Sequence, residues 1–106
     1  MNSRCRNIMN DLKEGLTAIY GPRLAGVYLF GSYARGDADA ESDLDVLVVL
    51  DRVDHYYSEL ERTSPLASGL SLKYGVSISR IFMPVVDWNR RDTPFLVNAH
   101  EEAIPA

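Results

Sequence analysis

The stretch LAGVYLFGSYARGDADAESDLDVLVVL, residues 24–50, decides the fold of this chain. It opens with a short apolar run, Leu24–Phe30, and closes with a second run that we expect to form a strand over Asp43–Asp51. Both runs have the length and the branched apolar side chains of buried strands. The residues between them are polar and contain glycine, which is typical of a loop with at most one helical turn. The stretch therefore predicts two strands joined by a polar loop.

The two junctions between loop and strand carry chemical groups. Asp43 and Asp45 are two residues apart, and side chains alternate along a strand, so both carboxylates should share one face with Leu47 and Val49. That face can offer oxygens to one or two divalent cations. The turn Gly31–Ser32, directly after the first strand, can offer backbone N–H groups to a phosphate. The pattern predicts a metal-dependent site for a nucleoside triphosphate.

Length and composition limit the other functions. The 106 residues are expected to form a single domain, residues 1–106, with one modest core. The net charge of -4 argues against direct nucleic-acid binding, which needs a positive surface. A single cysteine excludes an internal disulfide, and no apolar run is long enough to span a membrane or to act as a signal peptide. We expect a cytoplasmic protein with no membrane association.

Helix and strand patterns alternate along the rest of the chain. Apolar residues recur at helical spacing from Cys5 to Tyr20, with Asn2 or Ser3 as N-cap and Gly21–Pro22 as the stop. A mainly helical segment over residues 54–73 contains Pro65, which should break or kink it; a strand follows over Val76–Met83, and Thr93–Pro94 begins a helix to about Glu102. The order predicts an α+β fold, a small sheet with helices packed on one side.

The motif residues carry a resemblance to a known family. The run Gly31–Gly36, GSYARG, followed by Ser42–Val48, SDLDVLV, resembles the signature of the DNA polymerase β-type nucleotidyltransferase superfamily. The short chain and the G-S-x-A-R-G form resemble its minimal nucleotidyltransferase branch. Such proteins are typically encoded beside a HEPN-domain partner, and several of these pairs behave as toxin and antitoxin. The resemblance implies a small mixed sheet of the polymerase β palm type.

The resemblance also implies roles for the motif residues. Asp43 and Asp45 would be the catalytic residues and the ligands of Mg²⁺, with ATP as substrate. The nucleotide would be bound by Gly31, Ser32, Arg35 and Ser42. Arg35 can contact the phosphates or can instead brace the loop by pairing with Asp37 or Asp43. Ser42 is expected to orient Asp43 through a local hydroxyl–backbone bond.

One carboxylate of the family pattern is missing. Active members usually carry a third acid on a later strand, beside the first two, but the matching strand here has Ser77 and Ser79. Asp51 shares the face of Asp45 but lies about 20 Å along the strand. Asp87 follows the later strand and is a weaker alternative. Nucleotide binding is therefore better supported by the sequence than turnover.

Two functions remain open at this point. In the first, the chain transfers a nucleotide, AMP from ATP by preference, onto a hydroxyl of a protein partner and acts as the antitoxin of a HEPN-type RNase. In the second, it is a catalytically impaired nucleotide-binding module that neutralises its partner by direct binding. The intact Gly31–Ser32 turn and aspartate pair favour the first, and the missing acid favours the second. The oligomeric state, homo- or hetero-oligomeric, is left open.

Overall fold

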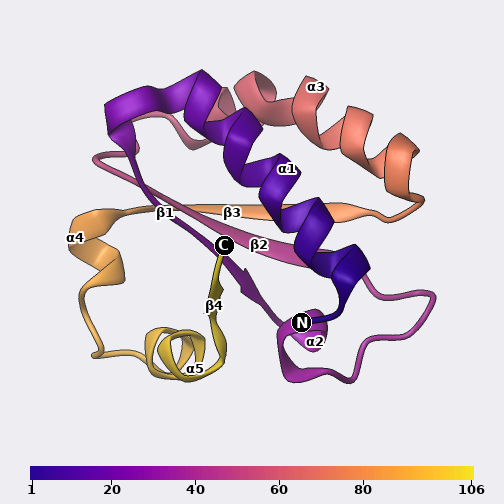
Figure 1. The fold of residues 1–106 in the computed structure, drawn as a ribbon. Coiled ribbons are helices and arrows are strands. Elements are labelled where there is room, and N and C mark those ends of the chain that lie inside the picture. Colours follow the sequence, from indigo (N-terminus) through magenta and orange to yellow (C-terminus); the bar gives the residue numbers. More distant parts are fainter.

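The computed structural model describes all 106 residues and shows a small mixed sheet between two layers of helices (Figure 1). The strands are β1 (Leu24–Phe30), β2 (Leu44–Leu50), β3 (Ile78–Pro84) and β4 (Ile104–Pro105). The helices are α1 (Ser3–Tyr20), α2 (Ser32–Arg35), α3 (Tyr56–Tyr74), α4 (Val85–Trp88) and α5 (Pro94–Glu102), with one 3₁₀ turn at Gly21–Arg23. The expected α+β fold with a small mixed sheet is confirmed.

The sheet contains both antiparallel and parallel neighbours. The sheet order is β3-β2-β1-β4, with β1 antiparallel to β2 and β2 parallel to β3. The connection over residues 31–43 returns the chain antiparallel to β1, whereas the parallel pair needs a crossover, which α3 provides. The short β4 was not expected from the sequence. It pairs with Tyr28 and Leu29 of β1 and is too brief to leave a periodic pattern.

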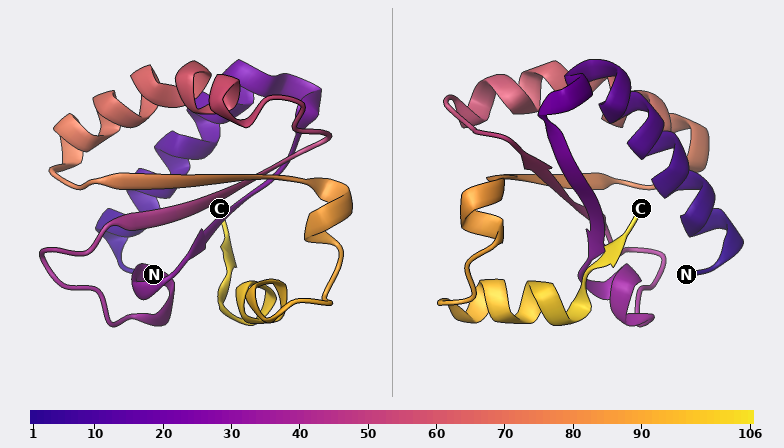
Figure 2. Two further views of the ribbon diagram at one scale, coloured as in Figure 1. Left: turned by 180° about the vertical axis from the view of Figure 1, so that it is seen from behind. Right: turned by 60° about the vertical axis from the view of Figure 1, so that its left-hand side comes forward.

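Both faces of the sheet are covered, but by different helices (Figure 2). The long helices α1 and α3 pack on the face that carries Leu44, Val46, Val48 and Leu50. On the other face, Leu47 and Val49 pack against Trp88, Leu96 and Ala99, which come from α4 and α5. The expectation of helices on one side thus holds for α1 and α3 and fails for α4 and α5. The alternation of side chains along β2 is as predicted, and it supplies apolar groups to both layers.

Local signals set most of the helix ends. The side chain of Asn2 accepts a hydrogen bond from the Cys5 N–H and caps α1, and Gly21 ends that helix. Thr93 caps α5 by accepting from the Leu96 N–H at 3.2 Å, with Pro94 in the first helical position. Both caps confirm the sequence predictions, because each depends on residues close together in the chain.

Several boundaries differ from the predictions. The second strand begins at Leu44, whose N–H donates to the Ser77 carbonyl at 2.8 Å, so Asp43 precedes the strand and Asp51 follows it. The third strand begins at Ile78, because Val76 and Ser77 belong to the turn after α3. Pro65 does not divide the predicted helix, and α3 runs through it without interruption.

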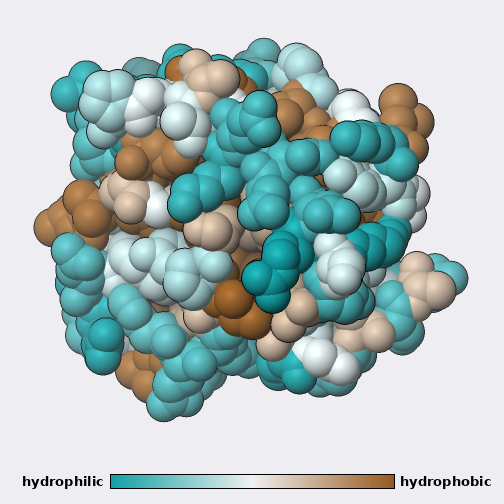
Figure 3. All heavy atoms as spheres, in the orientation of Figure 1, coloured by the Kyte–Doolittle hydropathy of each residue, from teal (hydrophilic) through white to brown (hydrophobic).

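None of the helices combines the length and the apolar character needed to cross a bilayer. In the view of Figure 3, hydrophilic residues surround separate apolar patches, and no single apolar face runs across this side of the molecule. The apolar residues of the two core clusters lie instead between the sheet and its helices.

The proline inside α3 generates a stability prediction. Pro65 is exposed and has no N–H to donate to the carbonyl four residues earlier, so Pro65→Ala should stabilise the protein. We expect a gain of about 1 kcal/mol, because the restored helix hydrogen bond is partly offset by a more flexible unfolded chain. Urea unfolding measures the change. Ser68→Ala, at another exposed position of α3, is the control for the general effect of alanine, and an equal gain there would contradict the explanation.

Candidate functional site

The end of β1 meets the beginning of β2 at the centre of the candidate site. Asp45 lies opposite Phe30 in the antiparallel register, and Gly31 follows Phe30 directly. Gly31 has a φ of 75°, a conformation that side chains other than glycine rarely adopt. A Cβ atom added there would overlap Oδ2 of Asp45 and lie 3.2 Å from its Cγ. The Gly31 backbone and the Asp45 carboxylate are therefore packed against each other.

A single helical turn follows this contact. Helix α2 begins at Ser32, and the Arg35 N–H donates to the Gly31 carbonyl at 3.0 Å. The first amides of a helix have no acceptor within it. Gly36, with a φ of 84°, ends the turn. The Gly31 backbone, at the N-cap of this turn, therefore lies beside the carboxylate of Asp45.

The two aspartates experience different environments. Asp43 is exposed and lies just before β2, whereas Asp45 is half-buried within the strand. Burial raises the pKa of the Asp45 carboxyl, and the nearby negative charge of Asp43 raises it further, while Arg35 acts in the opposite direction. Negative charge at this position is thus only partly compensated by the protein. A bound cation would relieve this repulsion, so the electrostatics favour a metal at the aspartate pair.

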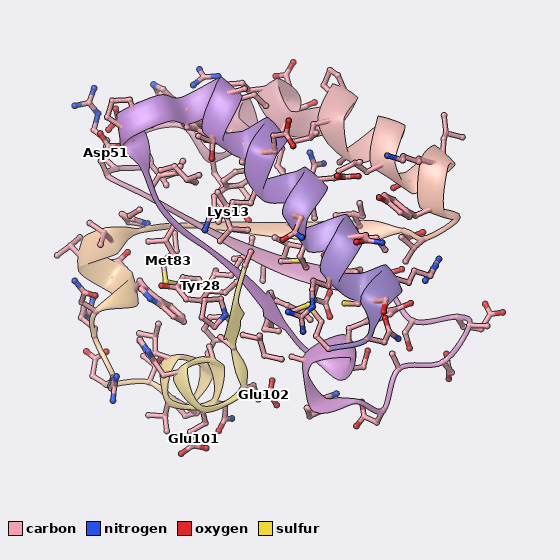
Figure 4. All side chains as sticks on the ribbon, viewed as in Figure 1. Lys13, Tyr28, Asp51, Met83, Glu101 and Glu102 are labelled. Carbon is pink, nitrogen blue, oxygen red and sulfur yellow. The ribbon has the colours of Figure 1, made fainter.

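Arg35 is held away from Asp43 by two other carboxylates. Its guanidinium pairs with Asp37 and with Glu102, each at 3.2 Å, and these hydrogen bonds raise its pKa. Of the alternatives left open by the sequence, the pairing with Asp37 is the one observed. Glu102 was missed, because it lies 67 residues from Arg35 in the chain and belongs to no motif. In Figure 4, Glu102 marks the end of α5, which approaches α2 from below the sheet.

Ser42 stabilises the loop rather than Asp43. Its hydroxyl oxygen accepts from the Asp39 N–H at 3.0 Å, and the hydroxyl donates to the Asp39 carboxylate at 3.2 Å. The expected bond that would orient Asp43 is absent. The Asp39 side chain also accepts from the Glu41 N–H, so a closed set of local bonds fixes the turn that leads into β2.

The position of the missing acid is now defined by the sheet. In the parallel register of β2 and β3, Ser79 is the partner of Asp45. Neighbouring residues in register point to the same face, so a carboxylate at Ser79 would lie beside Asp45. No group of three or more His, Cys, Asp and Glu residues is arranged to hold a metal ion. The chain supplies two carboxylates at this site, and a serine hydroxyl replaces the third.

The alternative acids lie at the other end of the sheet. Asp51 pairs with Arg23 at 3.1 Å, and this contact lowers its pKa. Figure 4 shows Asp51 far from α2 and from the end of α5.

Asp87 belongs to α4, which follows the end of β3 where Pro84 is in register with Leu50. Five strand residues, or roughly 17 Å, separate that end from Asp45, so neither acid can serve as the third ligand.

Comparison with known proteins gives matches over most of the chain. The family described as "Nucleotidyltransferase domain" matches residues 9–96. A protein of Methanocaldococcus jannaschii, named "Putative protein adenylyltransferase MJ0141", is 42% identical over 74 residues, which cover 70% of this chain and 74% of that protein. A second protein of the same organism, "Putative protein adenylyltransferase MJ0604", is 45% identical over 73 residues, 69% of this chain and 67% of its own length.

A solved structure shares the fold. It is described as a crystal structure of "the toxin-antitoxin with AMP-PNP", and it superposes with a TM-score of 0.66 and 22% identity. The match covers 92% of this chain and 70% of the other. At this level of identity the comparison establishes the architecture, and the sequence matches establish the family.

The opposite environments of Asp45 and Asp51 generate a prediction for the metal-free protein. At pH 7, Asp45→Asn should raise Tm by roughly 2 °C, the effect of about 0.3–0.5 kcal/mol in a domain of this size, because it removes a half-buried charge near Asp43. Asp51→Asn should lower Tm, because it breaks the pair with Arg23. Thermal unfolding in EDTA measures both, and a lower Tm for Asp45→Asn would contradict the assigned repulsion.

The same shifts predict opposite pH dependences. The pKa of Asp45 is raised in the folded state, so its ionisation costs stability as the pH rises through that folded value. The pKa of Asp51 is lowered in the folded state. Its ionised carboxylate therefore stabilises the folded protein at any pH above the pKa of the unfolded chain, and this stabilisation is lost as the pH falls through the pKa of the folded state. The Tm advantage of Asp45→Asn over the natural protein should therefore disappear in acid, where Asp45 is protonated.

Proposed function

Because the chain belongs to the nucleotidyltransferase domain family, we propose that it transfers an adenylyl group from ATP to a hydroxyl of a protein partner. The observation that supports this most directly is the contact between Gly31 and Asp45. It places a backbone segment that would bind phosphate next to a carboxylate that would bind the metal, with no side chain between them. The names of the two relatives, both protein adenylyltransferases, support AMP as the transferred group and a protein as its acceptor.

The triphosphate would bind over the turn after β1. Gly31 allows its backbone to approach the phosphates, and Ser32 would donate its N–H and hydroxyl to them. Arg35 would add positive charge at the edge of this site from its place between Asp37 and Glu102. Ser42 would contribute by holding the loop, through its bonds to Asp39, so that Asp43 stays near the nucleotide.

The aspartate pair fits Mg²⁺. Magnesium in phosphate-transfer sites commonly takes one or two protein carboxylates and completes its octahedral shell with phosphate oxygens and water. Asp43 and Asp45 supply that number, and burial together with the charge of Asp43 raises the pKa of Asp45, so a cation there would stabilise its ionised form. When bound, the metal supplies the positive charge that stabilises the attacking and leaving oxygens.

The reaction is a substitution at the α-phosphorus. The acceptor oxygen forms a bond to that phosphorus, the bond to the bridging oxygen breaks, and pyrophosphate leaves. The hydroxyl proton passes to solvent, because the strand next to Asp45 carries Ser79 and no carboxylate that could accept it. The chain's own residues would therefore act mainly by orienting the reactants and by holding charge, which predicts slow turnover.

The partner we propose is a HEPN-type RNase, with this chain as its antitoxin in the cytoplasm. The structural neighbour is a toxin–antitoxin complex crystallised with an ATP analogue, and it shares the fold of this chain. An adenylyl group on a tyrosine of the RNase would add bulk and negative charge, which opposes binding of RNA. Residues 1–106 would act as one minimal nucleotidyltransferase domain in this pair.

A second function is favoured by Ser79. With two carboxylates in place of three, the chain would bind Mg-ATP but turn it over too slowly to matter, and it would neutralise its partner by contact alone. Both functions use the same nucleotide site. They differ in whether AMP becomes attached to the partner, which increases the mass of the partner.

Two glycines with positive φ make a matched pair for testing nucleotide binding. Gly31→Ala should lose the thermal stabilisation by Mg-ATP, because its Cβ would displace Asp45. Gly36→Ala introduces the same backbone strain, but nothing lies within 4 Å of its Cβ, so it should keep that stabilisation. Thermal shifts with and without Mg-ATP compare them. Equal loss in both variants would remove the Gly31–Asp45 contact from the nucleotide site.

Turnover is tested at Ser79. We expect Ser79→Asp to increase adenylyl transfer about 10- to 100-fold, because it places a proton acceptor and metal ligand beside Asp45. Intact mass of the partner encoded by the adjacent gene, after incubation with Mg²⁺ and ATP, measures the transfer. Ser79→Asn controls for size. Mass gains in steps of one AMP that Asp43→Asn/Asp45→Asn abolishes support the enzyme, and a stable complex without any gain supports the binding module.

A further inference from the structure

Helix α5 lies beside the candidate site, and one of its flanks faces that site. Its buried residues, Leu96 and Ala99, pack toward the sheet. Phe95 and Glu102 lie on one flank of this buried stripe, about two helical turns apart, and Asp-free Asn98 lies between them at the three- and four-residue spacing of one helix face. This flank of α5 therefore carries an aromatic ring, an amide and a carboxylate.

Contacts at both ends of the flank fix its direction. Glu102 pairs with Arg35 of α2 at 3.2 Å. Figure 4 shows Glu102 pointing from α5 toward α2, whereas its neighbour Glu101 points away from the sheet. Phe95 contacts Phe30, the last residue of β1, with ring centroids 6.4 Å apart and ring planes at 88°. The flank thus extends from the end of β1 to the turn that follows it.

Phe30 connects this flank to the aspartate pair. Phe30 is opposite Asp45 in the antiparallel register, and directly opposed residues of neighbouring strands point to the same face with Cβ atoms about 5 Å apart. The backbone of Gly31, the next residue, packs against the Asp45 carboxylate. The Phe95 ring therefore lies one side chain beyond Asp45, on the face of the sheet where the metal and the α-phosphate would be held.

Phe95 is the aromatic side chain on this face with open surface. Tyr28 and Trp88 are stacked on each other with ring centroids 4.9 Å apart, and Trp88 is buried. Phe30 is half-buried and packs against the core. Phe95, by contrast, has 43% of its surface exposed. A flat apolar group that covered this ring would remove the exposed surface from water, which is favourable.

The covalent structure of the nucleotide brings its base near this ring. In the proposed function, the triphosphate lies over the turn at Gly31 and the α-phosphate lies beside Asp45. The base is joined to the α-phosphate through the ribose alone, so it has to lie within one sugar of Asp45. Stacking on an aromatic side chain is a common way to bind a nucleobase, and it tolerates any base. Phe95 has the position and the exposure for this contact.

Asn98 supplies a polar group that can distinguish between purines. It is exposed and lies one helical turn from Phe95 on the same flank. A side-chain amide carries both a donor and an acceptor, which match the amino group and the neighbouring ring nitrogen of adenine. Guanine presents two acceptors at the corresponding edge and matches the amide less well. The flank therefore favours adenine.

We propose that this flank of α5 binds the base of the nucleoside triphosphate, with Phe95 stacking on the base and Asn98 selecting adenine over guanine. The proposal rests on the proposed nucleotidyl transfer and adds the part of the site that recognises the base. Both residues lie outside the Gly31–Ser32 turn and the aspartate pair, so they complete the site from the C-terminal helix.

A ligand without a base separates this part of the site from the triphosphate part. Isothermal titration calorimetry measures the affinities for ATP, GTP and inorganic tripolyphosphate, each with Mg²⁺ and without a protein partner. Phe95→Ala should weaken ATP binding about 5- to 100-fold, the range expected for loss of one stacked base, and should leave tripolyphosphate binding unchanged. Phe95→Tyr keeps a ring at this position and should bind ATP as the natural protein does.

Val97→Ala is the matched control for Phe95→Ala. Val97 is also an exposed apolar residue of α5, with 40% of its surface open, but it lies two positions along the helix and so points away from the flank. Its replacement should leave the affinities for all three ligands unchanged. Asn98→Ala should reduce the preference for ATP over GTP about tenfold, because the amide no longer bonds to adenine, and should not change tripolyphosphate binding.

The outcomes separate the base site from the proposed function. Unchanged ATP affinity in Phe95→Ala, or equal weakening of ATP and tripolyphosphate, overturns the base site and leaves the triphosphate site standing. Equal losses in Phe95→Ala and Val97→Ala would also overturn it, because the effect would then belong to the helix as a whole. An unchanged preference for ATP in Asn98→Ala overturns the selection of adenine. Failure of the natural protein to bind both ATP and tripolyphosphate would contradict the proposed function and the base site together.

Discussion

The close packing of the Gly31 backbone against the Asp45 carboxylate is the constraint on which the site depends. It requires a residue without a Cβ atom, a positive φ directly after β1, and an antiparallel register that sets Asp45 opposite Phe30. A shift of one residue in that register would turn Asp45 to the other face, into the core beneath α1 and α3. The apolar layers on both sides of β2 therefore fix the chemistry at its end.

Charge at the site is distributed in a way that suits a cationic ligand. The protein directs its nearest cation, Arg35, to Asp37 and Glu102 and leaves the negative charge of the aspartate pair only partly compensated. The pairing with Glu102 also ties the end of α5 to the turn that would contact the phosphates.

The strand order brings residues from three strands to the same end of the sheet. The Gly31–Ser32 turn follows β1, Asp45 lies at the beginning of β2, and Ser79 is its neighbour on β3. Ser79 has a consequence in both functions that we consider. It places a hydroxyl group, and no carboxylate, in register with Asp45.

The sequence by itself determined the features that depend on neighbours in the chain. The caps at Asn2 and Thr93, the glycine turn and the alternation along β2 were predictable, because each rests on residues a few positions apart or on a simple period. Only the tertiary structure decided that α5 covers the second face, that Glu102 holds Arg35, that Asp51 and Asp87 lie at the far end, and that Ser79 is beside Asp45. These relations depend on sheet order and register, which follow from packing of the whole chain and leave no local pattern.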